Sequence, residues 1–275
     1  MEQENKDIIR KVKKGNRRIR RIIPFLAPFF FAHFPLPAGS YKAKSENTHL
    51  SAANAEALRF AAFQVDVYKL YEEIGLEKSG LSLNVFNDAL LGYLNLKAQG
   101  QLSDKNLLTV VDFDKPSTEK RLWVIDLGEK KVLFNSLVAH GKNSGENIAK
   151  EFDNTISSEK SSLGFYVTQD IYIGKHGTSL KLVGMDKDFN TNALERCVVM
   201  HGADYVSDAF ITQHGRLGRS QGCPALPMEN HRQIIEAVKG KTCLFIHADK
   251  KEYNSDYLDA ETALTYYSSM GNTII

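Results

Sequence analysis

A cysteine and a histidine 22 positions apart have the most distinctive chemistry in this chain. Cys223 lies in a turn-like run between Gly222 and a proline, and His201 ends an apolar run. A cysteine is nucleophilic as its thiolate, and a neighbouring imidazole usually takes the thiol proton. In such a turn the amides of Gly222 and Cys223 can stabilise an oxyanion by roughly 3–4 kcal/mol per donor, and the Ser220 hydroxyl can hold the turn. We therefore predict covalent catalysis by Cys223; a structural thiol in a loop is the alternative.

Two histidines compete for the role of proton acceptor. His201 is expected at the end of a strand, where its ring would have a fixed position. His214 is closer to Cys223 in the chain, but it lies in a glycine-containing stretch that we expect to be a mobile loop. We therefore assign the proton transfer to His201.

A zinc site is the competing interpretation of the same side chains. His201, His214, Cys223 and His247 are all ligand types for zinc. The chain has no Cys-x-x-Cys or His-x-x-x-His spacing to support such a site. We therefore predict neither a metal nor a cofactor.

The motif around Cys223 resembles the signature of the L,D-transpeptidase (YkuD-type) family. In that family His-Gly is followed by Ser/Thr-x-Gly-Cys, and here His201-Gly202 is followed by the run 218–223, GRSQGC. The run 161–167 resembles the family's Thr-Pro-x-Gly-x-aromatic start of a strand. The resemblance covers about residues 107–248 and is strongest to the divergent murein L,D-transpeptidase catalytic-domain branch, in which Gly-Arg-Ser-x-Gly-Cys-Pro is typical.

This resemblance implies a mostly β domain that transfers acyl groups on peptidoglycan stem peptides. It implies that Cys223 attacks an L-to-D linkage and forms a thioester, with His201 as proton acceptor and donor and with Gly222 and Cys223 supplying the oxyanion amides. The acyl group would pass to an amine or to water. Hydrolysis alone, as in an L,D-carboxypeptidase or another cysteine peptidase, and a non-catalytic wall-binding protein are the alternatives.

The chain departs from the family at two positions near the cysteine. Gln221 stands where many members have a histidine, and Ala225 where many have arginine or asparagine. The usual group that binds a substrate carboxylate is thus missing or moved. Arg219 or Arg216 is expected to replace it, because a guanidinium binds a carboxylate bidentately; two solvated surface arginines are the alternative.

Three other side chains are candidates for contact with substrate. Tyr205 follows His201 closely and could orient substrate. His140 and His176 each follow a strand-like run and precede a glycine, so that either could line the same cleft. We include Tyr205 and His140 in the predicted binding site, with a turn histidine as the alternative for His140.

The elements that must position these residues are mostly short strands. Several such strands with regular turns predict a closed or nearly closed β-sandwich or barrel. Apolar residues recur at helical spacing over 51–74 and 83–98, which predicts a small N-terminal helical hairpin beside the main domain. A helix is expected over 229–239, and a long loop over 141–160. The strands are expected at 107–113, 121–127, 132–139, 165–168, 171–173, 180–183, 197–200 and 243–247.

The predicted domain organisation begins with a targeting segment. Residues 1–38 carry a net charge of +6, so that the rest of the chain carries −4 of the overall +2. A basic stretch followed by 13 mostly apolar residues at 22–34 suits a signal peptide, with an uncleaved anchor or a cytosolic basic tail as alternatives. We therefore predict export to the periplasm or cell envelope, with membrane attachment through this segment if it is uncleaved. Then follow a linker and hairpin (39–106), the catalytic domain (107–248) and a tail (249–275).

The acidic body of the chain argues against nucleic-acid binding, which needs a broad basic surface. Its three cysteines are an odd number, which leaves at least one free thiol in an exported chain unless two chains pair. Cys197 and Cys243 lie in apolar, strand-like runs and are predicted to be buried and inert.

Overall fold

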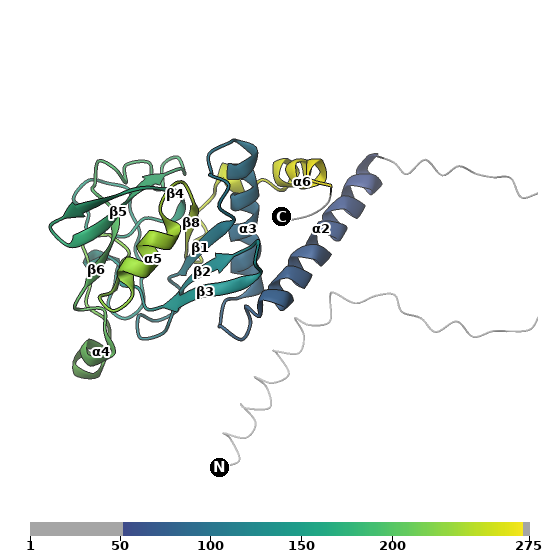
Figure 1. Cartoon of the computed structure of the whole chain (residues 1–275). Coiled ribbons are helices and arrows are strands. Elements are labelled where there is room, and N and C mark those ends of the chain that lie inside the picture. Colours follow the sequence, from purple (N-terminus) through teal and green to yellow (C-terminus); the bar gives the residue numbers. More distant parts are fainter. Residues whose placement is uncertain (1–51, 272–275) are drawn as a thin grey trace, which may run out of the picture. The chain divides into compact units, whose positions relative to one another are not determined.

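The computed structural model describes residues 52–271 (Figure 1). The predicted targeting segment at 1–38 lies outside these residues. Among the helices that the structure describes, none is both long enough and apolar enough to cross a membrane.

A single eight-stranded sheet organises the chain. Its spatial order is β3-β2-β1-β8-β4-β5-β6-β7. The pairs β1–β8 and β6–β7 are parallel, and the other neighbouring pairs are antiparallel. The strands are β1 (Leu107–Asp112), β2 (Leu122–Asp126), β3 (Lys131–Ser136), β4 (Gly164–Gly174), β5 (Gly177–Gly184), β6 (Val199–Ala203), β7 (Ala225–Pro227) and β8 (Cys243–His247).

The two ends of the sheet meet next to the predicted site. Ala139, shortly after β3, forms an antiparallel bridge with Ala225 in β7, and its N–H donates to the Ala225 carbonyl at 2.9 Å. Gly141 bridges Ser220 in the same region. The sheet is therefore nearly closed, which confirms the predicted mostly β, barrel-like architecture.

The two predicted N-terminal helices are α2 (Ala52–Ile74) and α3 (Leu83–Ala98). Ser82 caps α3 by accepting a hydrogen bond from the Val85 N–H at 3.3 Å. Helix α3 packs against β1 and β8, and Figure 1 shows it beside β1. Gly92 allows α3 to approach Phe165 of β4 closely, because a Cβ there would lie 2.0 Å from the Phe165 ring.

One face of the sheet shares a core with these helices. Phe165 and Phe245 stack in this core with ring centroids 4.3 Å apart.

The C-terminal stretch, for which the sequence predicted no element, forms η3 (Asp256–Leu258) and α6 (Ala260–Ser269). It is attached to α3 by Asn95, whose side chain donates to the Tyr257 carbonyl at 2.6 Å.

Helix α5 (His231–Val238) belongs to the second core, on the other side of the sheet. Its Ile234, Ile235 and Val238 are fully buried with Met200 and Leu244. This helix begins two residues later than the predicted helix over 229–239. It is the element that packs behind β6, the strand that carries His201.

Candidate active site

Neighbouring parallel strands bring His201 and Cys223 to one part of the sheet. His201 pairs with Ala225 across β6 and β7, and Cys223 precedes Ala225 by two residues. With strands ~4.8 Å apart and a rise of ~3.3 Å per residue, this register places the two Cα atoms roughly 8 Å apart. His201 lies within β6 and not after its end, because the strand continues through Ala203.

The Cys223 thiol is half-buried and hydrogen-bonded to backbone. The Val199 N–H donates to its Sγ at 3.4 Å, and the thiol donates to the Cys197 carbonyl at 3.7 Å. Burial raises the pKa of Cys223, whereas the Val199 N–H and the Arg196 guanidinium act in the opposite direction. Because the net shift is upward, the thiol rests in its protonated form near neutral pH.

The environment of His201 selects one tautomer of its ring. Nδ1 lies 2.9 Å from the Gly202 carbonyl oxygen. Because a carbonyl can only accept, Nδ1 must carry the hydrogen, which leaves a lone pair on Nε2 of the neutral ring. Burial is the main reason that the pKa of His201 is lowered. The resting arrangement is thus a neutral thiol and a neutral imidazole.

The turn before β7 depends on Gly222 and Ser220. Gly222 has φ +119°, and a Cβ there would lie 2.7 Å from the Lys160 carbonyl oxygen. Its N–H donates to Ser220 Oγ at 3.0 Å. Among residues 52–271 the Cys223 N–H donates no hydrogen bond. Of the two amides considered for an oxyanion, that of Cys223 is therefore the one without an internal acceptor.

The long loop after Ala139 holds this turn from the other side. Ser161 Oγ accepts from the Gly141 N–H at 3.0 Å and donates to the Gly222 carbonyl at 3.2 Å. The Lys142 N–H donates to the Ser220 carbonyl at 2.8 Å. Two segments far apart in the sequence are thereby joined directly beside Cys223.

Arg196 is a residue of this site that sequence reasoning missed. Its guanidinium donates to the Asp153 carbonyl at 2.7 Å, the Lys160 carbonyl at 2.6 Å, Ser158 Oγ at 3.1 Å and the Ser162 hydroxyl. It thereby ties the loop to the segment before β6 and places a positive charge near Cys223. No motif in the sequence marked it, since its partners are two backbone carbonyls and two serine hydroxyls of a distant loop.

Two further histidines surround His201. The His176 ring stacks on the His201 ring with centroids 4.3 Å apart. His231 was also missed by sequence reasoning. A Cβ at position 202 would lie 2.6 Å from the His231 ring, which explains physically why glycine follows His201.

The structure corrects the prediction for His140. This side chain is 0% exposed and therefore lies out of reach of substrate. Its Nδ1 accepts from the Arg121 guanidinium at 2.8 Å, and its Nε2 donates to the Gly145 carbonyl at 3.3 Å. Burial and the Arg121 charge lower the pKa of His140 to about 4, so that it is a neutral structural bridge.

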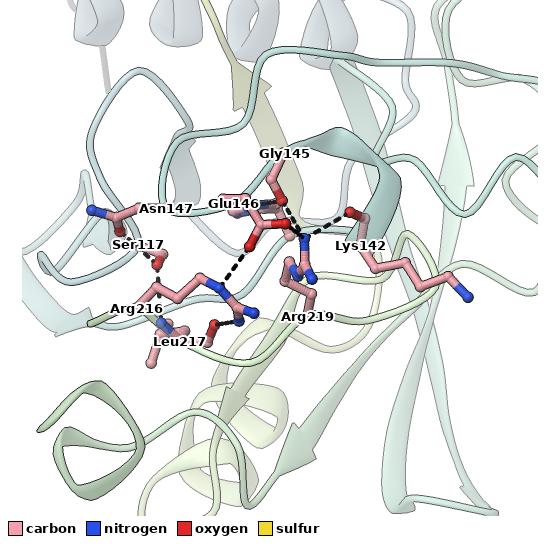
Figure 2. Close-up of polar contacts among 9 residues, drawn as sticks. Ser117, Lys142, Gly145, Glu146, Asn147, Arg216, Leu217 and Arg219 are labelled. Atoms are coloured by element: carbon pink, nitrogen blue, oxygen red, sulfur yellow. Dashed lines mark hydrogen bonds and ion pairs between the residues drawn. The ribbon is translucent and has the colours of Figure 1, made fainter. Parts of the chain in front are cut away.

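Arg216 and Arg219 converge on the carboxylate of Glu146, as Figure 2 shows. Arg216 Nε lies 2.8 Å from Oε2, and Arg219 Nη1 lies 2.6 Å from Oε1. Arg219 also donates to the Gly145 carbonyl at 2.9 Å. The two guanidiniums can therefore hold one carboxylate together, and in this structure that carboxylate belongs to the chain itself.

Tyr205 and His214 differ in their relation to Cys223. Burial, and next the neighbouring Cys223, raise the pKa of Tyr205 to about 12. A Cβ at Gly218 would lie 2.4 Å from the Cβ of Tyr205, so that this tyrosine packs against the loop that leads to the cysteine. His214 ends helix α4 (Asp208–His214), where its ring lies 4.2 Å from that of Phe210. It therefore lies in a helix and not in the predicted mobile loop.

The other two cysteines have different environments. Cys243 is buried in β8, as predicted, but Cys197 is exposed, and that prediction was wrong. Cys197 has φ 55°, which is incompatible with an extended strand, and β6 begins only at Val199. The four candidate zinc ligands do not form one site. In the described part of the chain, only His247 belongs to a cluster of potential metal ligands, and its neighbours there are Asp112 and Asp114.

Comparison with known proteins identifies a matching family. The L,D-transpeptidase catalytic domain family matches residues 77–247, a region that includes α3 as well as the sheet. No curated protein matches this chain.

Three solved structures are similar to this chain at low identity. An L,D-transpeptidase from Mycobacterium smegmatis has 15% identity and a TM-score of 0.31, over 52% of this chain and 59% of that one. The helical cell shape determining protein Pgp2 from Campylobacter jejuni has 16% identity and a TM-score of 0.33, over 68% and 63%. An L,D-transpeptidase from Stackebrandtia nassauensis has 15% identity and a TM-score of 0.30, over 68% and 78%. This chain thus spans less than two thirds of the mycobacterial protein.

Proposed function

Because this chain belongs to the L,D-transpeptidase catalytic domain family, we propose that it transfers acyl groups on peptidoglycan stem peptides through a thioester at Cys223. The observation that carries this proposal is the placement of Cys223 beside the strand of His201, whose hydrogen bond to the Gly202 carbonyl leaves Nε2 as a base. Among the described residues, neither of the other two cysteines lies before β7, because Cys197 lies before β6 and Cys243 lies within β8.

The reaction begins from the neutral pair. His201 Nε2 takes the thiol proton as Sγ turns from the Cys197 carbonyl and attacks the carbonyl carbon of an L-to-D linkage. The Cys223 N–H stabilises the oxyanion of the tetrahedral intermediate. His201 then returns the proton to the leaving amine, and the thioester remains. In the second half His201 deprotonates an acceptor amine, which attacks the thioester and releases Cys223.

Arg216 and Arg219 are the proposed contacts for a substrate carboxylate. A stem peptide ends in a carboxylate, and two guanidiniums that already hold Glu146 have the geometry to hold another carboxylate. Tyr205 is the proposed contact that orients the peptide beside Cys223. We further propose that residues 1–38 direct the chain to the cell envelope. Cell fractionation with N-terminal sequencing tests this step: recovery of the chain in the cytosol with Met1 retained would overturn it.

Mass spectrometry of purified muropeptides incubated with the protein tests the proposed reaction. We expect cross-linked dimers with the natural protein, none with Cys223→Ala, and undiminished dimers with Cys197→Ser, since the exposed Cys197 thiol has no part in the proposed reaction. Shortened stem peptides without dimers would show that the protein hydrolyses its substrate and does not transfer the acyl group to an amine. Wall binding without either product, and without a carbapenem adduct at Cys223, would establish a binding protein instead.

The choice of base is tested separately. His201→Ala is expected to abolish turnover, whereas His214→Ala is expected to retain it, because His214 lies at the end of α4. Turnover that survives in the first variant and is lost in the second would overturn the assignment of His201.

A further inference from the structure

His176 lies directly on the ring of the proposed base. The centroids of His176 and His201 are 4.3 Å apart and the planes differ by 23°, which is a stacked arrangement. His176 comes from the turn between β4 and β5, a hairpin that Figure 1 shows next to β6. His176 is exposed, whereas His201 is only 2% exposed. The turn residue therefore covers the base on the side that faces solvent.

Few titratable groups lie near His201, and His176 is the one with the largest effect on its pKa. The residues opposite it on β5 and β7 are Ser179 and Ala225, and neither is ionisable. The titratable groups that act on it are His176 from the hairpin and His231 from α5, and both disfavour its protonated form. His231 is itself engaged, since its Nδ1 lies 3.0 Å from the Met228 carbonyl oxygen.

We propose, building on the function proposed above, that His176 is a positioning residue whose stacked ring orients His201 and favours the neutral form of that base. Two imidazolium rings at this separation would repel each other, and the nearby His176 contributes to the lowered pKa of His201. The stack thus favours the neutral His201 ring that can take the thiol proton and makes the protonated ring a stronger acid toward the leaving amine.

A histidine-selective NMR titration tests the stack independently of turnover. In the natural protein we expect the His201 ring to have a lowered pKa. His176→Phe keeps an aromatic ring over His201 but removes the ionisable group, so that His201 should titrate at higher pH. His214→Phe is the matched control, since it also removes an exposed histidine that contacts an aromatic ring. Superimposable His201 titration curves in the natural protein and His176→Phe would overturn the proposal.

The rate at which a carbapenem acylates Cys223 gives a second measurement. His176→Phe should move the acidic limb of the pH–rate profile to higher pH, because His201 must be neutral to take the proton. His176→Ala should lower the rate at every pH by roughly 10-fold, since the base loses its support. Unchanged profiles in both variants would also overturn the proposal. Failure of acylation in the natural protein would instead refute the proposed function. The NMR titration would then still test the role of His176.

Discussion

The hydroxyl of Ser220 donates a hydrogen bond to the carbonyl oxygen of Cys223 at 2.7 Å. The same Oγ accepts from the Gly222 N–H at 3.0 Å, so that one small side chain closes the turn that presents the thiol. This relationship gives Ser220 a role in the shape of the site without any contact with the reacting atoms.

Ser220→Ala should therefore weaken both folding and reactivity. The substitution leaves the buried Gly222 N–H without a partner, at a cost of about 1–3 kcal/mol in the free energy of unfolding. Urea denaturation measures this change, and carbapenem acylation of Cys223 should slow in parallel. Ser207→Ala, which removes the N-cap of the peripheral helix α4, is the control and should leave acylation unchanged. Normal acylation in Ser220→Ala would contradict this role.

Arg196→Met should raise the pKa of the Cys223 thiol further. The guanidinium favours the thiolate, so that its removal shifts thiolate formation to higher pH. The measurement is the rate of iodoacetamide alkylation against pH, read from the Cys223 peptide by mass spectrometry. The exposed Arg232→Met should leave the curve in place. A curve that moves to lower pH in Arg196→Met would show that Arg196 does not stabilise the thiolate.

Glu146→Gln should release Arg216 and Arg219 for an external carboxylate. Because the Glu146 side chain is 71% exposed, we expect little change in stability. The KM for a stem peptide with a free carboxylate should fall, while the KM for its carboxamide should not. Glu119→Gln removes a comparable exposed ion pair with Lys115 and serves as the control. An unchanged KM would favour two ordinary surface arginines.

His140 should make the protein less stable in acid. In the folded state its pKa is lowered from 6.5 to about 4. As pH falls below 6.5 the unfolded chain binds a proton that the folded chain refuses, so that the free energy of unfolding decreases down to about pH 4. The full effect of this one group is on the order of 3 kcal/mol.

Urea denaturation at several pH values measures this loss. His140→Gln can still accept from Arg121 and should flatten the pH dependence. His214→Gln, at the exposed end of α4, should not change it. An equally steep acid loss in His140→Gln would assign the effect to other groups.

The spacing of apolar residues along the sequence predicted the architecture well. The apolar periodicity over 51–74 and 83–98 predicted α2 and α3 closely, and the short apolar runs predicted most strands of the nearly closed sheet. Helical periodicity and strand alternation are properties of neighbouring residues, so that they can be read without knowledge of the fold. The strand predicted to begin at Cys197 begins instead at Val199, because a turn imposes φ 55° at Cys197.

The motif of Cys223 and His201 was visible in the chain because the chemistry needs particular residue types at a particular spacing. Their surroundings were not visible. Burial of His140, exposure of Cys197, the Arg196 contacts and the stack of His176 on His201 all depend on segments that meet only after folding. Residue types and local spacing thus determine which reaction this chain is equipped for. Charge state, tautomer and access depend on distant neighbours and on removal from water, which only the tertiary structure sets.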